Sequence, residues 1–277
     1  MSMESAVQRW NEILDARAQQ MDAAYARLGR TSADFWERRA RGFHRSTKDT
    51  VSRDPFYLRL CEKVSSHTTL LDVGAGTGRF SLALAPRVNH IIAVEPSKAM
   101  LDFLRQDSVD NDLRNMSFVQ STWQEAPENL QADIVICSHV VYPIRDIEPF
   151  LLKLHKASLQ GCYIYVRATH IDALTADIWR HFHHDERCMP PSYIHVLDVL
   201  YEMGMYVNAE IVSLPPSLRY PSLDVAVHEM AEQLILPEDE KTLLELRALL
   251  EEWLVELDGM FVPPGQKMQS AIIRWEK

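Results

Sequence analysis

Three of the nine glycines in this 277-residue chain stand within five residues, between Gly74 and Gly78. They follow the apolar run LLDV at 70–73, and the acid Asp72 lies two residues before the first of them. Glycines at such a turn permit a tight backbone and let it approach a ligand closely. A carboxylate at this place suits a ligand that carries an ammonium group and would repel a pyrophosphate.

A nicotinamide dinucleotide does not match this turn. The fingerprint G-x-G-x-x-G/A fails because its last position falls on Arg79 or Ser81, and the phosphate loop G-x-x-x-x-G-K-[ST] is absent. A second carboxylate, Glu95, ends the next apolar run, IIAV at 91–94. A carboxylate at a strand end can accept hydrogen bonds from both hydroxyls of a ribose. Together the two elements predict a site for a nucleoside that bears an amine.

Three segments resemble the class I S-adenosylmethionine (SAM)-dependent methyltransferases, and among them the broad type 11-like group that methylates small molecules. They are LLDVGAGTGRF at 70–80, AVEPSKAML at 93–101 and ADIVICSHV at 132–140. A W-x-x-R-A-x-x-F-like stretch at 36–43 adds to the similarity, which covers roughly 66–213 and the last strand. The resemblance implies an enzyme that uses SAM as its methyl donor and releases S-adenosylhomocysteine.

The resemblance also assigns residues to this cofactor. It places the methionine portion at Asp72 and the glycine loop (74–78), the ribose at Glu95, and the methyl group near Ser138 at the end of the fourth strand. Thr122 stands where many members have an acid that faces the adenine, so the backbone of the next residue is expected to serve there. The complete set is Asp72, Gly74, Ala75, Gly76, Thr77, Gly78, Glu95, Pro96, Ser97, Met100, Thr122, Trp123, Ser138, Trp36 and Arg39.

Basic residues gather at 38–48, just before the first strand. Such a cluster is more often a solvated helix face than a binding surface. It could also cover the cofactor, in which case Arg39 is the best candidate to pair with the SAM carboxylate or with an acidic acceptor.

His139 is the first candidate for catalysis, because it follows the fourth strand, where open α/β sheets place their ligands. A neutral imidazole there could take a proton from the acceptor. The alternative is a histidine that only lines the site. Tyr142 and His170, the latter at the end of the fifth strand, are weaker candidates for the same work.

A dense group of possible ligands, His181, His183, His184 and Cys188, follows later in the chain. Its spacing matches no established metal motif. We therefore expect no metal, and we interpret this segment as a wall of the substrate site.

Short apolar runs alternate with amphipathic stretches from residue 69 to 213, and one further run closes the chain. Strands that alternate with helices predict a parallel sheet covered on both faces. We expect an α/β, Rossmann-like, doubly wound and mostly parallel seven-stranded sheet with an antiparallel last strand. The predicted strands are 69–73, 90–94, 115–120, 132–137, 162–168, 205–213 and 269–276, and the predicted helices between them are 78–86, 97–106, 146–159 and 192–203.

Further helices are predicted outside this alternation. Apolar spacing predicts helices at 2–29 and 32–43, which make residues 1–50 an N-terminal helical cap on a SAM-binding domain at 51–277. A helical insert at 222–258 precedes the last strand and is predicted as two helices, 222–235 and 238–257. We expect the cap and the insert to form the lid and the acceptor pocket. The apolar side of the insert would be covered by the cap or by a second subunit.

Charge and composition exclude some classes of binding partner and favour one cellular compartment. The 29 basic and 39 acidic residues give a net charge of −10, so nucleic acid is not an expected partner. No run reaches 18 apolar residues and the first residues do not resemble a signal peptide, so we expect no contact with a membrane. Four cysteines without a C-x-x-C pair are typical of reduced thiols, which favours the cytoplasm. A monomer or a homodimer is expected.

The sequence therefore predicts SAM-dependent methyl transfer to a small-molecule acceptor, mainly by positioning and exclusion of water, with a candidate general base after the fourth strand. Two alternatives belong to other classes. One is a non-catalytic SAM-binding regulator or scaffold, and the other is a methyltransferase of protein or RNA.

Overall fold

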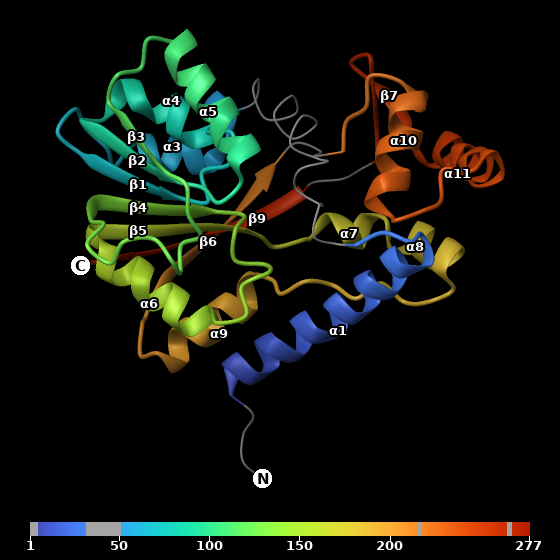
Figure 1. Ribbon diagram of the computed structural model, residues 1–277, viewed down its shortest axis with the longest axis horizontal. Helices are drawn as coiled ribbons and strands as arrows, with labels where there is room; N and C mark the ends of the chain where they lie inside the picture. The colour runs from blue at the N-terminus through green and yellow to red at the C-terminus, as the bar shows by residue number, and fades with distance from the viewer. Residues whose placement is uncertain (1–4, 32–50, 215–217, 265–267) are drawn as a thin grey trace.

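Seven strands form one mixed sheet in the order β3-β2-β1-β4-β5-β9-β6 (Figure 1). The computed structural model describes residues 5–31, 51–214, 218–264 and 268–277. All neighbouring strands in the sheet are parallel except at β9, which runs antiparallel to both β5 and β6. The predicted Rossmann-like sheet with an antiparallel last strand is confirmed. The strands are β1 (Thr69–Val73), β2 (His90–Val94), β3 (Met116–Val119), β4 (Ala132–Ser138), β5 (Ser158–Arg167), β6 (Asn208–Leu214) and β9 (Met268–Glu276).

The helices predicted between the strands are present. They are α4 (Arg79–Leu84), α5 (Lys98–Asp110), α6 (Ile147–Ala157) and α9 (Tyr193–Glu202). Strand β5 begins at Ser158 rather than at 162, because it follows α6 without a loop. None of the helices in the described part of the chain is both long and apolar enough to cross a membrane.

Three short helices escaped the sequence analysis. They are α3 (Pro55–Cys61), α7 (Ile171–Leu174) and α8 (Ala176–His183). Each is shorter than the window over which helical periodicity can be read. The start of α3 nevertheless carries a local signal, since the Asp54 side chain accepts a hydrogen bond from the Phe56 amide and a proline takes the first helical position.

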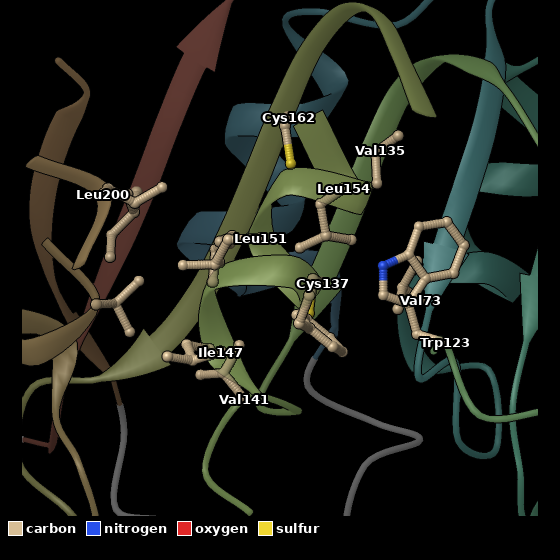
Figure 2. Packing of buried hydrophobic residues seen from close by; sticks show 14 of the residues in the cluster. Val73, Trp123, Val135, Cys137, Val141, Ile147, Leu151, Leu154, Cys162 and Leu200 are labelled. Atoms are coloured by element: carbon tan, nitrogen blue, oxygen red, sulfur yellow. The ribbon is translucent and has the colours of Figure 1, made fainter. Parts of the chain in front are cut away.

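Both faces of the sheet are covered, and β4 shows why its sequence is continuously apolar. Val135 and Cys137 pack into a cluster with α6, α9 and α1, whereas Ile134 and Ile136 pack into a cluster with α3 and α4. Figure 2 shows the first cluster beneath the sheet. The strand therefore has no face for water, as the doubly wound architecture requires.

Helix α1 (Ala6–Arg27), the helix predicted at 2–29, spans two hydrophobic clusters (Figure 1). Its first half packs under the sheet through Trp10, whose Nε1 donates a hydrogen bond to the Ile144 carbonyl at 2.7 Å. Its last turns bring Tyr25 into the cluster of the insert. The second predicted helix of the cap, 32–43, lies outside the described residues.

The insert contains α10 (Leu223–Gln233), α11 (Glu240–Trp253) and a small hairpin of β7 (Val255–Leu257) and β8 (Met260–Val262). The prediction of a helix to 257 is wrong after Trp253. Asp258 and Gly259 both have positive φ, 52° and 71°, the two-residue turn that an Asp-Gly pair favours in a hairpin. The apolar side of the insert packs on α8 and the end of α1, with Trp179 fully buried between them. This cover comes from the same chain.

Candidate active site

The carboxyl ends of β1, β2, β4 and β5 meet along one edge of the sheet, here called the carboxyl edge. The glycine loop follows β1 at this edge. Gly74, Gly76 and Gly78 have φ of +73°, +57° and +86°, values that side chains rarely adopt. A Cβ on Gly74 would lie 2.2 Å from Cγ2 of Val140, so the loop also lies directly against the segment that follows β4.

Asp72 is 3% exposed, and its Oδ2 accepts a hydrogen bond of 2.5 Å from the Ser81 hydroxyl. Burial raises the pKa of this carboxyl to about 7, against the hydrogen bond from Ser81, which lowers it. A cation beside Asp72 would favour its ionised form. The site is therefore suited to an ammonium group.

Glu95 is 6% exposed at the end of β2. Its Oε2 accepts a hydrogen bond from the Gly76 amide at 2.9 Å, and its Oε1 accepts one from the Ser97 amide at 2.8 Å. A carboxylate offers about four acceptor positions, so these two bonds fix its orientation and leave positions for two hydroxyls. Burial raises the pKa of Glu95, and the two amide bonds oppose that rise.

The other predicted cofactor residues have different surroundings. Ser97 caps α5, Met100 is buried in the first turn of that helix, and Pro96 is exposed. Ala75 and Thr77 are buried within the loop, and Ser138 is partly exposed at the end of β4. These six residues lie along the carboxyl edge, and their contact with a cofactor stays a prediction. Trp36 and Arg39 lie outside the described residues.

Thr122 and Trp123 follow β3. The Thr122 hydroxyl donates a hydrogen bond to Glu125 at 2.8 Å, so the acid missing from this position is present three residues later in the chain. The Trp123 ring is 3% exposed and packs in the same cluster as Val73 (Figure 2), with Lys153 Nζ 5.0 Å from the ring centroid. The indole belongs to the core, so any contact from Trp123 to a ligand rests on its backbone.

The three predicted catalytic residues lie together. His139 follows β4 in a left-handed conformation, φ +58°, and its amide donates a hydrogen bond to the Tyr165 carbonyl at 2.8 Å. Its Nδ1 is 3.1 Å from the Tyr142 hydroxyl, and the Tyr142 and His170 ring centroids are 5.6 Å apart. A left-handed non-glycine residue is strained, and such strain is concentrated at functional sites.

The hydrogen bonds of this trio restrict where its protons lie. The Tyr142 hydroxyl accepts the Arg167 amide at 2.7 Å and also bonds Nδ1 of His139, where the donor is set by the imidazole tautomer. Nδ1 of His170 accepts the Asp172 amide at 3.2 Å. Neutral His170 therefore carries its proton on Nε2, and neutral His139 does so when the Tyr142 hydroxyl donates to its Nδ1.

The ionisation of the trio agrees with neutral rings. Burial and the nearby charges of Arg167 and Arg79 lower the pKa of His139 well below 6.5. Burial lowers the pKa of His170 to about 4, although Asp172 opposes the change. Burial also raises the pKa of Tyr142 to about 12. All three side chains are uncharged at neutral pH.

A group of polar residues beside this trio was missed by the sequence analysis. Arg79 Nη2 pairs with Asp54 Oδ2 at 2.7 Å, and Asp54 is 2% exposed. Tyr165 stacks on Phe56 with centroids 4.6 Å apart, and Arg167 ends the same strand as Tyr165. The signal was present as an arginine inside the run CYIYVRA at 162–168.

A second charged group lies further along the chain, at α7. Asp172 Oδ2 is 2.6 Å from Nη1 of Arg17 and 3.2 Å from Nη2 of Arg187, and both Asp172 and Arg187 are buried. The Arg187 guanidinium also stacks over the Trp179 ring at 3.7 Å. This group joins α1, α7 and α8 next to His170.

The histidines at 181–184 do not converge. His181 Nε2 bonds Glu245 Oε1 at 2.8 Å, His183 Nε2 donates to the Leu234 carbonyl at 2.7 Å, and His184 ends α8 in a left-handed conformation. Within the described ranges, no three His, Cys, Asp or Glu side chains come together as metal ligands. His181 and His184 line a surface hollow with α11, which does not include the residues of the glycine loop.

Comparison with known proteins identifies this arrangement. Residues 64–200 match the family model of a methyltransferase domain. These residues form a SAM-dependent methyltransferase domain with the class I fold. SAM is the methyl donor of these methyltransferases, and the glycine loop, Asp72 and Glu95 fit it through their backbone approach, buried carboxylate and free acceptor positions.

Two curated relatives of this chain share the domain. One is an uncharacterized protein of Haemophilus influenzae, 25% identical over 158 residues, which are 54% of this chain and 55% of the relative. The other is a ubiquinone biosynthesis O-methyltransferase of Rickettsia bellii, 26% identical over 103 residues, which are 35% of this chain and 42% of the relative. The chain thus spans about half the length of the curated relatives it matches.

Two solved structures share the fold. A putative methyltransferase from Bacillus halodurans has a TM-score of 0.54 and 13% identity, over 82% of this chain and 98% of that chain. The YcgJ protein from Bacillus subtilis has a TM-score of 0.52 and 16% identity, over 84% of this chain and 98% of that chain. At these identities the likeness concerns the fold alone.

Proposed function

We propose that this protein transfers the methyl group of SAM to a small-molecule acceptor at the carboxyl edge of the sheet. One observation carries the proposal. The fold brings Asp72, the glycine loop and Glu95 to the same edge as His139, so a donor site and a reaction site adjoin.

Each element of the donor site binds a different part of SAM in this proposal. Ionised Asp72 attracts the ammonium group, the glycine loop lets the backbone approach the methionine portion, and Glu95 accepts from the ribose hydroxyls. SAM supplies a methyl group that its sulfonium has already activated. The protein therefore has to hold the acceptor in line with that methyl group and exclude water, and such positioning can supply about 7–11 kcal/mol of the barrier.

His139 has a different role here from the one that its position after β4 first indicates. In this proposal the Tyr142 hydroxyl donates its proton to Nδ1 of His139, so Nε2 carries the proton of the neutral ring. A protonated Nε2 orients an acceptor oxygen or nitrogen by donating a hydrogen bond, but it cannot remove a proton. We therefore propose that His139 positions the acceptor, and that Tyr142 and His170 support it as neutral residues.

The small-molecule acceptor is supported by charge and by one relative. A net charge of −10 disfavours an RNA acceptor. The Rickettsia relative is named a ubiquinone biosynthesis O-methyltransferase, and this name supports a small-molecule acceptor. Free thiols at Cys61, Cys137, Cys162 and Cys188 agree with the cytoplasm as the compartment.

The proposal is tested with purified protein in two steps. Titration calorimetry is expected to show SAM binding in the micromolar range, about 8 kcal/mol, and no NAD binding. Incubation with methyl-labelled SAM and a cell extract separated by size is expected to label a small metabolite. Label in protein or RNA would favour the macromolecular alternative, and SAM binding without any labelled product would favour a regulatory or scaffold protein.

A further inference from the structure

Four buried polar atoms at the carboxyl edge have no hydrogen-bond partner among the described residues. They are Arg167 Nη1, Arg79 Nε, Tyr165 Oη and Ser270 Oγ; the Tyr165 hydroxyl does approach Ser270 and Asp54, but not in the geometry of a hydrogen bond. Buried polar atoms in proteins are nearly always paired, so each such atom requires an explanation. Four that belong to neighbouring residues point to a missing partner that they share.

These atoms lie on adjoining parts of the fold. Ser270 of β9 is directly opposite Arg167 of β5 in the antiparallel ladder. Tyr165 precedes Arg167 by two residues, so both side chains start from the same face of β5. The Tyr165 ring contacts Phe80, the residue after Arg79, with centroids 6.2 Å apart.

The group also adjoins the proposed reaction site. The Tyr165 and His139 ring centroids are 4.9 Å apart, and the Arg167 amide donates to Tyr142. Strand β4 separates β5 from β1, which carries the glycine loop. Since neighbouring strands are about 4.8 Å apart, Arg167 starts about 10 Å from that loop, on the acceptor side of His139.

The charges at this place do not balance. Arg79 is paired with Asp54, but no ion pair of Arg167 is present in the parts of the chain that the structure describes. One guanidinium charge is thus left over. Burial lowers the pKa of Arg167, which agrees with a guanidinium that is partly withdrawn from water. All four unpaired atoms can donate a hydrogen bond, so they match an acceptor-only group.

We propose that the methyl acceptor carries a carboxylate, and that the Arg167 guanidinium binds it with help from the hydroxyls of Tyr165 and Ser270. This inference rests on the proposed function. A planar guanidinium matches a carboxylate through two parallel hydrogen bonds. A single uncompensated charge suits a monoanion better than a phosphate dianion. The carboxylate would anchor the acceptor beside His139, where the methyl group is transferred.

The test uses the full chain saturated with S-adenosylhomocysteine, which takes the place of the donor. Acetate, hexanoate and benzoate are titrated in by calorimetry, together with their methyl esters and inorganic phosphate. We expect at least one carboxylate to bind, and its neutral ester not to bind. Arg167→Gln should weaken the binding of that carboxylate about tenfold or more. The affinity of Arg167→Lys should lie between those of the parent protein and Arg167→Gln, because lysine keeps the positive charge but cannot form two parallel hydrogen bonds.

Matched controls separate this effect from general electrostatics and from misfolding. Arg114→Gln removes an exposed arginine just before β3, paired only with exposed Asp112, and should leave carboxylate binding unchanged. If Arg167→Gln does not fold, Ser270→Ala should still weaken carboxylate binding several-fold. Without ligands, Arg167→Gln should melt no lower than the parent protein, because it removes an unpaired buried charge.

Several results would overturn the inference. They are equal carboxylate affinity in Arg167→Gln, tighter binding of phosphate than of every carboxylate, or no carboxylate binding at all. A loss of S-adenosylhomocysteine affinity in Arg167→Gln would show instead that Arg167 holds the carboxylate of the donor. If the parent protein does not bind S-adenosylhomocysteine, the proposed function itself fails, so the two failures are distinguishable.

Discussion

Replacing Asp72 with asparagine should stabilise the ligand-free protein at neutral and alkaline pH while it weakens SAM binding. The carboxyl is buried, has one hydrogen bond from Ser81, and has its pKa raised to about 7 by burial. Ionisation of this group is therefore costly in the folded state. The ammonium group of a bound ligand would offset that cost, so we expect the buried carboxylate to favour SAM binding at the expense of the stability of the free protein.

The size of the effect follows from the pKa. A rise from the ordinary value of 3.8 to about 7 is worth at most about 4 kcal/mol, at about 1.4 kcal/mol for each pH unit. Between these two pH values the folded state binds more protons at Asp72 than the unfolded state does. The free energy of unfolding therefore falls as pH rises from about 4 to about 7, and the contribution is constant above that range.

Urea denaturation at pH 5 and pH 8 measures this contribution as the difference between the parent protein and Asp72→Asn. The two proteins should diverge at pH 8 by a few kcal/mol. Ser81→Ala should move the parent transition to higher pH, because it removes the hydrogen bond that favours ionised Asp72. SAM affinity of the parent should improve between pH 5 and pH 7, by up to about tenfold per pH unit, whereas that of Asp72→Asn should be weaker and flat. Parallel stability curves for the two proteins, or unchanged SAM affinity in Asp72→Asn, would refute the reasoning.

Three further predictions follow from the site. Glu95→Gln should weaken SAM binding by about 1.5–3 kcal/mol in calorimetry, whereas the exposed control Glu128→Gln should not. Equal affinities of the two variants would show that Glu95 does not bind the ribose. His139→Gln, which keeps a donor near Nε2, should retain labelled-methyl transfer within about tenfold, and His139→Ala should lose more; a loss of 10²–10⁴ in both would instead indicate a general base. Gly74→Ala should lower the melting temperature more than Gly204→Ala, because both have positive φ but only Gly74 has a neighbour within 4 Å; equal losses would show that Val140 moves aside without cost.

The sequence by itself determined the sheet and the residues of the proposed donor site of this protein. Strands such as IVIC at 134–137 are apolar on both faces because helices cover both faces of the sheet. A continuous apolar run of this kind can be read directly from the sequence. The glycine loop and Glu95 are likewise local, since a turn and a strand end specify them within a few residues. Their positions could therefore be predicted before any contact was known. The helix predicted to 257 was wrong because a leucine-rich periodicity masked the Asp-Gly turn at 258 and 259.

Only the tertiary structure decided the contacts of the proposed reaction site. Nothing in the spacing of His139, Tyr142 and Arg167 shows that a tyrosine hydroxyl joins the imidazole to the Arg167 amide, because β4 and β5 are brought together by the sheet. The lack of an ion-pair partner for Arg167 among the described residues is also invisible in sequence, where acids and bases appear equally available as partners. Pairing and burial depend on which side chains exclude water from one another. That exclusion arises between segments far apart in the chain, so it exists only once the fold has formed.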